Sequence, residues 1–151
     1  MLKTPQSFTP VIDPLPHADP LNFIFNEGRL LVREADHALP DASLLAAVGA
    51  DASRLQPVGM FGDRYCQATW AEGDLAPPDG YAWRGLRSLF GAWDEEMLAV
   101  GGRASQVSEW ARTHRFCGVC GSSMERVPGE RCFKCTSCRM MAYPRISPAM
   151  M

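Results

Sequence analysis

Two Cys-x-x-Cys turns decide the fold of the C-terminal part of this chain: Cys117-Gly118-Val119-Cys120 and, after fourteen intervening residues, Cys135-Thr136-Ser137-Cys138. Each turn can place two thiolates on one side of a metal ion. Two such turns that face each other complete the tetrahedral shell of four sulfurs that Zn²⁺ prefers. The sequence therefore predicts a structural zinc site with four ligands: Cys117, Cys120, Cys135 and Cys138.

Two other uses of paired thiols are open from the residues alone. A redox Cys-x-x-Cys usually occurs once, at the start of a helix, and neither turn here is followed by a helical apolar pattern. Disulfides need an oxidising compartment, and no apolar signal segment opens the sequence. Structural zinc is the favoured interpretation.

Two further cysteines need separate explanations. Cys132 forms a third Cys-x-x-Cys with Cys135, but the bulky Phe133 and Lys134 between them suit a strand better than a thiolate turn. We therefore expect Cys132 to be a buried or edge thiol, with a ligand role as the alternative. Cys66 stands in an apolar run and is expected to be a small core residue.

The composition limits the size of the core and the kind of protein. With 151 residues, 46% of them hydrophobic and 21% charged, the chain can form one ordinary core and a small metal-held module. No run approaches the roughly 20 apolar residues of a membrane span, so we expect a cytoplasmic protein that does not enter a membrane.

Charge is distributed unevenly along the chain. Residues 111–151 contain seven Arg or Lys and two Glu, a formal +5, which leaves −7 for residues 1–110 of a chain with a net charge of −2. Four thiolates and one Zn²⁺ would together lower the C-terminal value by two. A basic module beside an acidic body suggests an anionic ligand such as phosphate or nucleic acid, and a solvated ribbon surface is the equally weighted alternative.

The N-terminal part has the pattern of short strands and helices. Five prolines within residues 1–20 predict an extended, mostly irregular segment that adds no element. Leu30 to Val32 indicate a strand over Arg29–Arg33, Ser43–Val48 a brief helix, and Val58–Phe61 with Tyr65–Trp70 a hairpin.

A longer helix is predicted after Asp94, which can cap its first turn. Apolar residues follow at helical spacing: Met97, Val100, Ala104, Val107 and Ala111. Gly101 and Gly102 are expected to weaken or bend this helix, at a cost of roughly 1 kcal/mol each. After it, a strand over Glu130–Lys134 and a turn at Pro128-Gly129 predict an antiparallel zinc ribbon.

The predicted fold class is α+β, with a small mixed sheet and a few helices followed by the ribbon. The expected boundaries are 1–113 for the N-terminal domain and 114–145 for the ribbon. A module of some thirty residues cannot bury enough apolar area to offset its chain entropy, so zinc binding is expected to supply much of its folding free energy.

The C-terminal residues resemble a known family. One long stretch is similar to the NADH pyrophosphatase (NAD⁺ diphosphatase) branch of the Nudix hydrolases. It runs from Glu109-Trp110 through His114-Arg115-Phe116 and the two cysteine turns to residues 143–148, Tyr-Pro-Arg-Ile-Ser-Pro. Leu86–Phe90 also resembles a segment of that family. The family joins an N-terminal α/β domain and a zinc ribbon to a catalytic Nudix domain.

The resemblance implies a substrate class and some contacts. Its substrates would be NADH, NAD⁺ and NAD-capped RNA, cleaved at the pyrophosphate, and its members are generally homodimers. By position in the motif, Tyr143 and Glu130 match substrate contacts of the family, and Arg87 and Arg33 match basic contacts by a looser alignment. A tyrosine can stack on a base, an arginine can hold a phosphate and a carboxylate can accept from ribose hydroxyls.

The catalytic motif of the resembled family is missing. Nudix hydrolysis needs Gly-x₅-Glu-x₇-Arg-Glu-x-x-Glu-Glu, whose carboxylates hold Mg²⁺ or Mn²⁺, and this sequence has no such stretch. We therefore expect no catalytic residue here and no hydrolysis by the chain alone. Residues 146–151 resemble the opening of a first catalytic strand, which favours a portion of a larger protein.

A second hypothesis belongs to a different class of function. The basic residues of the ribbon could follow the phosphates of a nucleic acid, without hydrolase chemistry, and salt-sensitive RNA binding would be its signature. A stand-alone interaction protein that forms a dimer is the third possibility.

Overall fold

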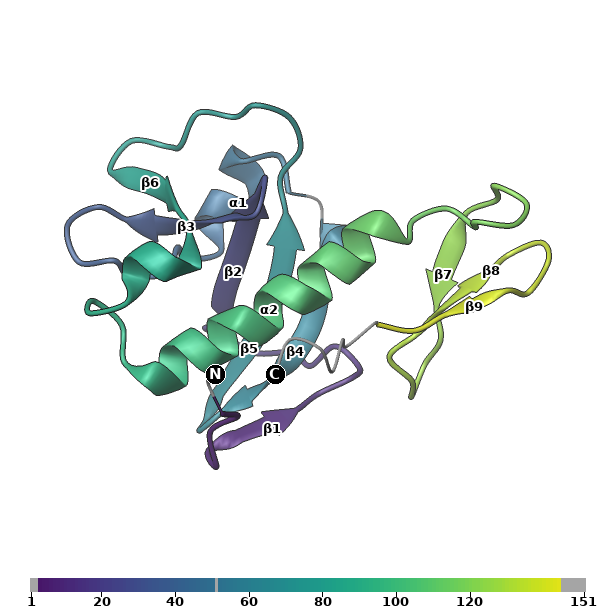
Figure 1. Ribbon diagram of the computed structural model, residues 1–151, viewed down its shortest axis with the longest axis horizontal. Coiled ribbons are helices and arrows are strands. Elements are labelled where there is room, and N and C mark those ends of the chain that lie inside the picture. The colour runs from purple at the N-terminus through teal and green to yellow at the C-terminus, as the bar shows by residue number, and fades with distance from the viewer. Residues whose placement is uncertain (1–2, 51, 145–151) are drawn as a thin grey trace.

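The computed structural model describes residues 3–50 and 52–144, which form two parts of unequal size (Figure 1). The larger part is a six-stranded mixed sheet in the order β1-β4-β5-β2-β3-β6, and the smaller is a three-stranded antiparallel sheet, β7-β8-β9. The predicted α+β class, with a mixed sheet followed by an antiparallel ribbon, is confirmed. Arg145 and the predicted segment 146–151 lie outside the described residues.

The strands of the larger sheet are β1 (Phe8–Pro10), β2 (Leu21–Asn26), β3 (Arg29–Arg33), β4 (Gln56–Phe61), β5 (Arg64–Trp70) and β6 (Tyr81–Arg84). The helices are α1 (Ser43–Ala47), the 3₁₀ turns η1 (Ala52–Arg54) and η2 (Leu86–Leu89), and α2 (Glu95–Thr113). The ribbon strands are β7 (Met124–Arg126), β8 (Phe133–Cys135) and β9 (Met141–Ala142).

Three local predictions are confirmed. Strand β3 has the expected bounds, α1 begins at Ser43 as expected and ends one residue early, and β4 and β5 form the expected hairpin around Gly62. Gly62 has a φ of 62°, a left-handed conformation that favours glycine.

Strand β2 was not predicted, although it lies at the centre of the sheet. It pairs in parallel with β5 on one side and antiparallel with β3 on the other. Its residues from Asn22 to Asn26 are all buried, because α2 covers one face of the sheet and a second apolar cluster around Ile24 and Leu31 fills the other. A strand that is buried on both faces shows no alternation of polar and apolar residues, so period-two reasoning does not detect it.

The proline-rich N-terminal segment contains a strand, which corrects the expectation that it adds no element. Strand β1 pairs antiparallel with β4, with Phe8 opposite Phe61 and Pro10 opposite Gly59. It lies at the edge of the sheet and ends at Pro10, where a missing N–H is tolerated. Gly59 is required here, because a Cβ would lie 2.4 Å from the Phe8 ring and 2.5 Å from a main-chain oxygen of Thr9.

Helix α2 confirms the capped, amphipathic helix that the sequence predicts. The Asp94 carboxylate accepts a hydrogen bond from the Met97 N–H at 2.8 Å, which satisfies a donor of the first turn. The predicted apolar residues from Val100 to Ala111 are buried against β2, β4 and β5, and Met97 is half-buried. No helix in the described part of the chain is long and apolar enough to cross a membrane.

The glycines of α2 do not interrupt it, because the helix runs from Glu95 to Thr113, and the expected bending or weakening stays a prediction. Gly101 is buried, and a Cβ there would lie 3.2 Å from Leu86 Cδ2 and 3.3 Å from Trp93 Cζ3. The absence of a side chain lets η2 and the loop after it approach the helix, which offsets the low helix propensity of glycine.

The ribbon packs against the end of α2. An aromatic cluster, which we call the joint, combines Trp70 of β5, Trp110 and Ala111 of α2 and Phe133 of β8, with Met124 of β7 at its edge. The rings of Trp110 and Phe133 are stacked with centroids 4.5 Å apart. The larger part and the ribbon therefore share a small apolar core of their own.

Candidate metal centre

Four sulfur atoms meet at one end of the ribbon. The Sγ atoms of Cys117, Cys120, Cys135 and Cys138 all lie within 4.8 Å of one another. The Cys117 and Cys138 sulfurs are 3.5 Å apart, and the Cys120 and Cys135 sulfurs are 3.4 Å apart. A tetrahedral zinc site with Zn–S bonds of ~2.3 Å has sulfur separations of about 3.8 Å, so this donor set fits Zn²⁺.

Both cysteine turns present main-chain N–H groups to sulfur. Cys117 Sγ accepts from the amides of Val119 and Cys120 at 3.3 and 3.5 Å. Cys135 Sγ accepts from the amides of Ser137 and Cys138, both at 3.3 Å. Donors aimed at sulfur favour the thiolate, which is the form that binds a metal.

The two turns also end alike. The residue after the second cysteine is Gly121 in one turn and Arg139 in the other, and their φ angles are 79° and 66°. Glycine adopts this left-handed conformation without a steric cost, whereas arginine does not. The two turns thus share one backbone shape, and only the first has the residue that suits it.

The surroundings of Cys120 and Cys138 shift the pKa values of these two thiols in opposite directions. The pKa of Cys120 is lowered to about 6, first by a hydrogen bond from the Ser122 side chain and then by the Ser122 amide and neighbouring sulfur. The pKa of Cys138 is raised: the Met140 amide lowers it, but this is outweighed by the other three sulfurs and by desolvation, which disfavour a second negative charge. A divalent cation removes this repulsion, so metal binding and loss of the thiol protons are linked.

The remaining cysteines and the nearby His114 lie outside the cluster of four sulfur atoms. Cys132 is 1% exposed and lies outside the sulfur cluster, and Cys66 is fully buried in the larger core, as predicted. Burial raises the pKa of both thiols. His114 Nδ1 lies 2.7 Å from the Trp110 carbonyl oxygen, at the end of α2.

The ribbon strand before the second turn starts later than predicted. Strand β8 begins at Phe133, whereas the sequence indicated Glu130 as its start. The Val127 N–H donates to the Cys132 carbonyl at 3.1 Å, and the Glu130 N–H donates to the Val127 carbonyl at 3.3 Å. These bonds keep residues 127–132 in a closed turn, with Gly129 at a φ of 79°.

The four predicted substrate contacts fall into two separate groups. Tyr143 is 52% exposed, and its hydroxyl donates to Glu130 Oε2 at 3.4 Å, so these two residues are neighbours in the ribbon. Arg33 ends β3, and Arg87 lies exposed on η2 just after β6. Strands β3 and β6 form one side of the sheet, while the residues around Tyr143 lie near β1 and β4 on the other.

Arg33 is already engaged within the chain. Its Nε and one terminal nitrogen donate to the two carboxylate oxygens of Asp36 at 2.9 and 2.7 Å. The hydrogen bond from Arg33 is the largest cause that lowers the pKa of Asp36 to about 2. A phosphate would therefore have to compete with an existing bidentate partner.

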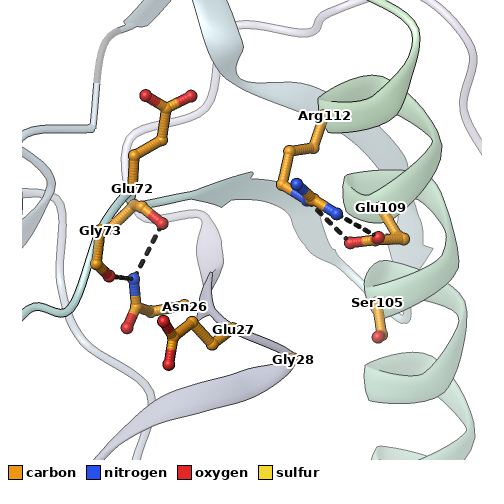
Figure 2. A pocket seen from close by; sticks show the side chains of 9 residues that line it. Asn26, Glu27, Gly28, Glu72, Gly73, Ser105, Glu109 and Arg112 are labelled. Carbon is orange, nitrogen blue, oxygen red and sulfur yellow. Dashed lines mark hydrogen bonds and ion pairs between the residues drawn. The ribbon is translucent and has the colours of Figure 1, made fainter.

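One sizeable cavity among the described residues was not predicted. It has a volume of about 660 Å³ and lies where the parallel strands β2 and β5 end, facing α2 (Figure 2). Its charged groups are mostly paired, because Arg112 binds both carboxylate oxygens of Glu109, at 3.0 Å for Oε2. Asn26 donates to the carbonyls of Ala71 and Gly73 and so closes the end of the cavity.

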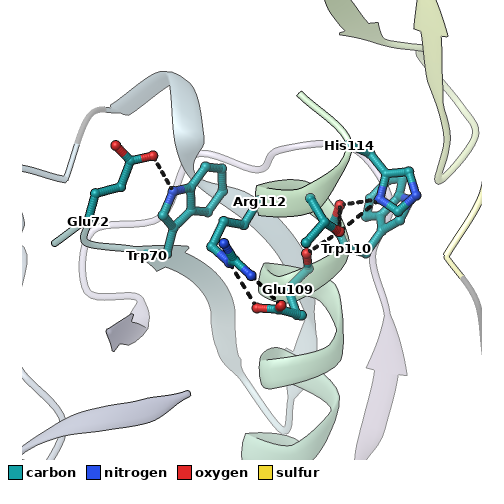
Figure 3. A network of polar contacts seen from close by, with 7 residues as sticks. Trp70, Glu72, Glu109, Trp110, Arg112 and His114 are labelled. Carbon is teal, nitrogen blue, oxygen red and sulfur yellow. Dashed lines mark hydrogen bonds and ion pairs between the residues drawn. The ribbon is translucent and has the colours of Figure 1, made fainter. Parts of the chain in front are cut away.

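Polar contacts surround the ends of β5 and α2, and Figure 3 shows the contact between Trp70 and Glu72. Glu72 accepts from Trp70 Nε1 at 3.4 Å and forms an ion pair with Arg115 at 2.7 Å. Arg115 follows α2 and belongs to the ribbon, so Glu72 ties the larger sheet to it. No sequence signal marked Glu72, because its role depends on residues 43 positions apart.

Comparisons with known proteins agree with this architecture. Residues 21–110 match the model of the NADH pyrophosphatase-like rudimentary NUDIX domain, and residues 112–143 match that of the NADH pyrophosphatase zinc ribbon domain. The first match covers the larger sheet from β2 and nearly all of α2, and the second covers the four cysteines.

Several similar curated proteins are named NAD-capped RNA hydrolase NudC. The protein from Deinococcus radiodurans is 36% identical over 132 residues, which are 87% of this chain and 44% of that protein. One from Pseudomonas fluorescens Pf-5 is 48% identical over 71 residues, which are 47% of this chain and 26% of that protein. The chain thus spans less than half the length of the curated relatives it matches. On the two domain matches and the clustered thiols, the chain belongs to the NADH pyrophosphatase family, with its rudimentary NUDIX domain and its zinc ribbon.

Proposed function

We propose that this chain is the non-catalytic N-terminal and zinc-ribbon portion of an NAD⁺/NADH and NAD-capped RNA pyrophosphatase. It contributes a structural zinc, dimerisation and part of the dinucleotide site. The observation that carries the proposal is the cluster of four thiols in a ribbon of this family. The proposed units are residues 1–113 and 114–145, and 146–151 would begin the catalytic domain, whose Mg²⁺ or Mn²⁺ the pyrophosphate chemistry requires.

The zinc would have a structural role and no catalytic one. Four thiolates fill a tetrahedral shell and leave no position for water, so the ion would stabilise the ribbon without activating a nucleophile. The ribbon in turn fixes Glu130 and Tyr143, which lie on either side of β8 along the chain and meet in space. The phenol would stack on or bind the dinucleotide, with the carboxylate orienting its hydroxyl.

The separation of the predicted contacts supports the proposed homodimer. Six strands at a spacing of ~4.8 Å place β1 and β6 about 24 Å apart. Tyr143 lies near the β1 side, and Arg33 and Arg87 lie at the β3 and β6 side. Two copies that face each other would bring the arginines of one toward the tyrosine of the other.

A titration of the zinc-loaded chain with NAD⁺, followed by NMR, tests the dinucleotide site. We expect the amide signals near Tyr143 to shift, Tyr143→Ala to abolish the shift, and Tyr143→Phe to retain most of it because stacking needs only the ring. Tyr81→Ala, on the opposite edge strand, is the control and should bind as the unmodified chain does. Unchanged binding of NAD⁺ by Tyr143→Ala would show that Tyr143 is not part of the dinucleotide site.

The alternative, a nucleic-acid-binding ribbon, has less support from the contacts. Most of the basic side chains that made this segment positive are used internally: Arg112 pairs with Glu109, Arg115 with Glu72 and Arg126 with Asp13. Arg131 donates to main-chain carbonyls. Uncapped RNA that binds strongly at low salt, with no preference for an NAD cap, would favour this alternative.

A further inference from the structure

A second cavity lies between three segments that are distant in the sequence. It has a volume of about 260 Å³ and is walled by Pro10 and Val58 of the β1–β4 edge, Val107 of α2, and Tyr143 and Pro144 of the ribbon. Two guanidinium groups, of Arg103 and Arg131, and the Gln106 amide complete the lining. No carboxylate is among these lining residues, so the charged groups of the cavity are all positive.

Arg131 is a half-buried cation held by neutral acceptors. It donates to the carbonyls of Pro57 at 2.7 Å and Val11 at 2.6 Å, and more weakly to that of Val58 at 3.5 Å. Within the described residues it forms no ion pair with a carboxylate. Burial lowers its pKa, and the nearby charges of Arg126 and Arg103 lower it further. A partly desolvated cation beside two other cations would be stabilised by a nearby negative charge.

Arg103 adds a second cation without an acidic partner in the described part of the chain. Its guanidinium carbon lies 5.5 Å from the centroid of the Phe8 ring. That contact places the planar cation over an aromatic face and leaves its N–H donors available. Arg126, by contrast, already pairs with Asp13, at 3.6 Å.

We propose that this cavity binds the phosphate of a phosphomonoester, with the guanidinium of Arg103 on the phosphate, the positive charge of Arg131 beside it and the apolar walls on the group it carries. The forked donors of Arg103 match phosphate oxygens, and Val58, Val107 and the two prolines suit a planar apolar substituent. The inference rests on the proposed function in one respect: Tyr143 lines the same cavity, so the bound phosphate would lie beside the proposed dinucleotide contact.

The test uses the zinc-loaded chain, with inorganic phosphate and phenyl phosphate as probes in calorimetry at constant ionic strength set by chloride. We expect phenyl phosphate to bind more tightly than phosphate, because only the former reaches the apolar walls. Arg103→Gln should weaken both by about 10-fold or more, the loss of one charge-assisted contact. Arg84→Gln, which removes the same charge from the exposed end of β6, should change the affinity less than 2-fold.

Several outcomes would overturn the inference: no binding of either probe above that of chloride, equal weakening in Arg103→Gln and Arg84→Gln, or equal affinity for the two probes. Arg103 makes no hydrogen bond that the structure describes, so its loss should leave the fold intact, and thermal unfolding checks this. Arg103→Lys, which keeps the charge, should recover part of the affinity and serves as the second variant.

The same experiment separates this inference from the proposed function. If phosphate binding fails while NAD⁺ still shifts the signals near Tyr143, only the phosphate cavity is refuted. If NAD⁺ does not bind while phenyl phosphate binds with dependence on Arg103, the dinucleotide proposal falls and the cavity stands.

Discussion

The larger sheet and the ribbon are stabilised in different ways. The larger sheet buries a cluster of large apolar side chains between β2, β3, β4 and α2, among them Phe23, Phe25 and Leu30. The ribbon has strands of three, three and two residues, and its buried apolar set is small: Cys117, Cys132, Phe133, Cys135 and Ala142. Three of these five are cysteines. We therefore expect a hydrophobic core to be sufficient for the first unit and the second to depend on metal coordination.

Removal of zinc should give the largest difference in stability between the larger sheet and the ribbon. Structural zinc contributes an apparent ~10–16 kcal/mol in zinc-finger peptides. We expect chelation, or Cys135→Ser, to unfold residues 115–143 while the larger sheet keeps its protected amides in hydrogen exchange. Cys132→Ser is the control: it should lose some stability and still hold one zinc per chain by elemental analysis. Loss of zinc from Cys132→Ser would contradict the assignment of the four ligands.

The joint between the two units gives the next largest effect. Trp110 is 6% exposed and stacks on Phe133, so Trp110→Ala should cost about 3–5 kcal/mol. Because the ring contacts both units, we expect the thermal transitions of sheet and ribbon to separate. Trp110→Phe, which keeps an aromatic face, should lose much less. A single transition with unchanged midpoint in Trp110→Ala would show that the two units are not coupled through this ring.

Alkaline pH should weaken the larger core. Burial raises the pKa of Cys66 from 9.0 to about 11, so its neutral thiol is favoured in the folded state. The contribution of this thiol to the free energy of unfolding is fully present below pH 9 and is lost as the pH rises through 11. The total loss is about 2–3 kcal/mol. Denaturant unfolding of the chain and of Cys66→Ala at pH 8.5 and 11 should show a smaller pH dependence in the variant. An identical pH dependence would exclude this thiol as its source.

The smallest expected change in stability comes from substitutions that compare the two cysteine turns with each other. Arg139 has a φ of 66°, so Arg139→Gly should stabilise the ribbon by about 1 kcal/mol. The reciprocal change Gly121→Ala, at a φ of 79°, should destabilise it by about 1–2 kcal/mol. Competition with a chelator of known affinity measures both as changes in zinc affinity. A weaker affinity in Arg139→Gly would indicate that its side chain has a stabilising contact.

The sequence was most informative where structure depends on neighbours along the chain. The cap at Asp94, the apolar spacing of α2 and the clustering of the cysteine turns are local patterns, and these three predictions are confirmed. It was least informative where structure depends on distant segments. Strand β2 shows no alternation because both of its faces are covered, and β1 forms because an edge position tolerates Pro10.

The same contrast holds for the sites. The zinc ligands follow from spacing, but the cavity at Arg103 and Arg131 depends on the carbonyls of Val11 and Pro57, which no sequence pattern connects to them. The substrate contacts at Tyr143, Glu130, Arg87 and Arg33 came from family resemblance and stay predictions. The structure adds that the first two are neighbours and that the last two lie across the sheet.

The bonds from Arg131 also have a consequence for biosynthesis. They join a residue of the ribbon to Val11 and Pro57, which are 120 and 74 positions earlier. A ribosome releases the edge of the sheet long before it makes the arginine that binds there. During synthesis the carbonyl groups of the segment after β1 would therefore stay hydrated until the ribbon has emerged and acquired its metal. The supply of zinc in the cell would thus time the completion of the N-terminal edge.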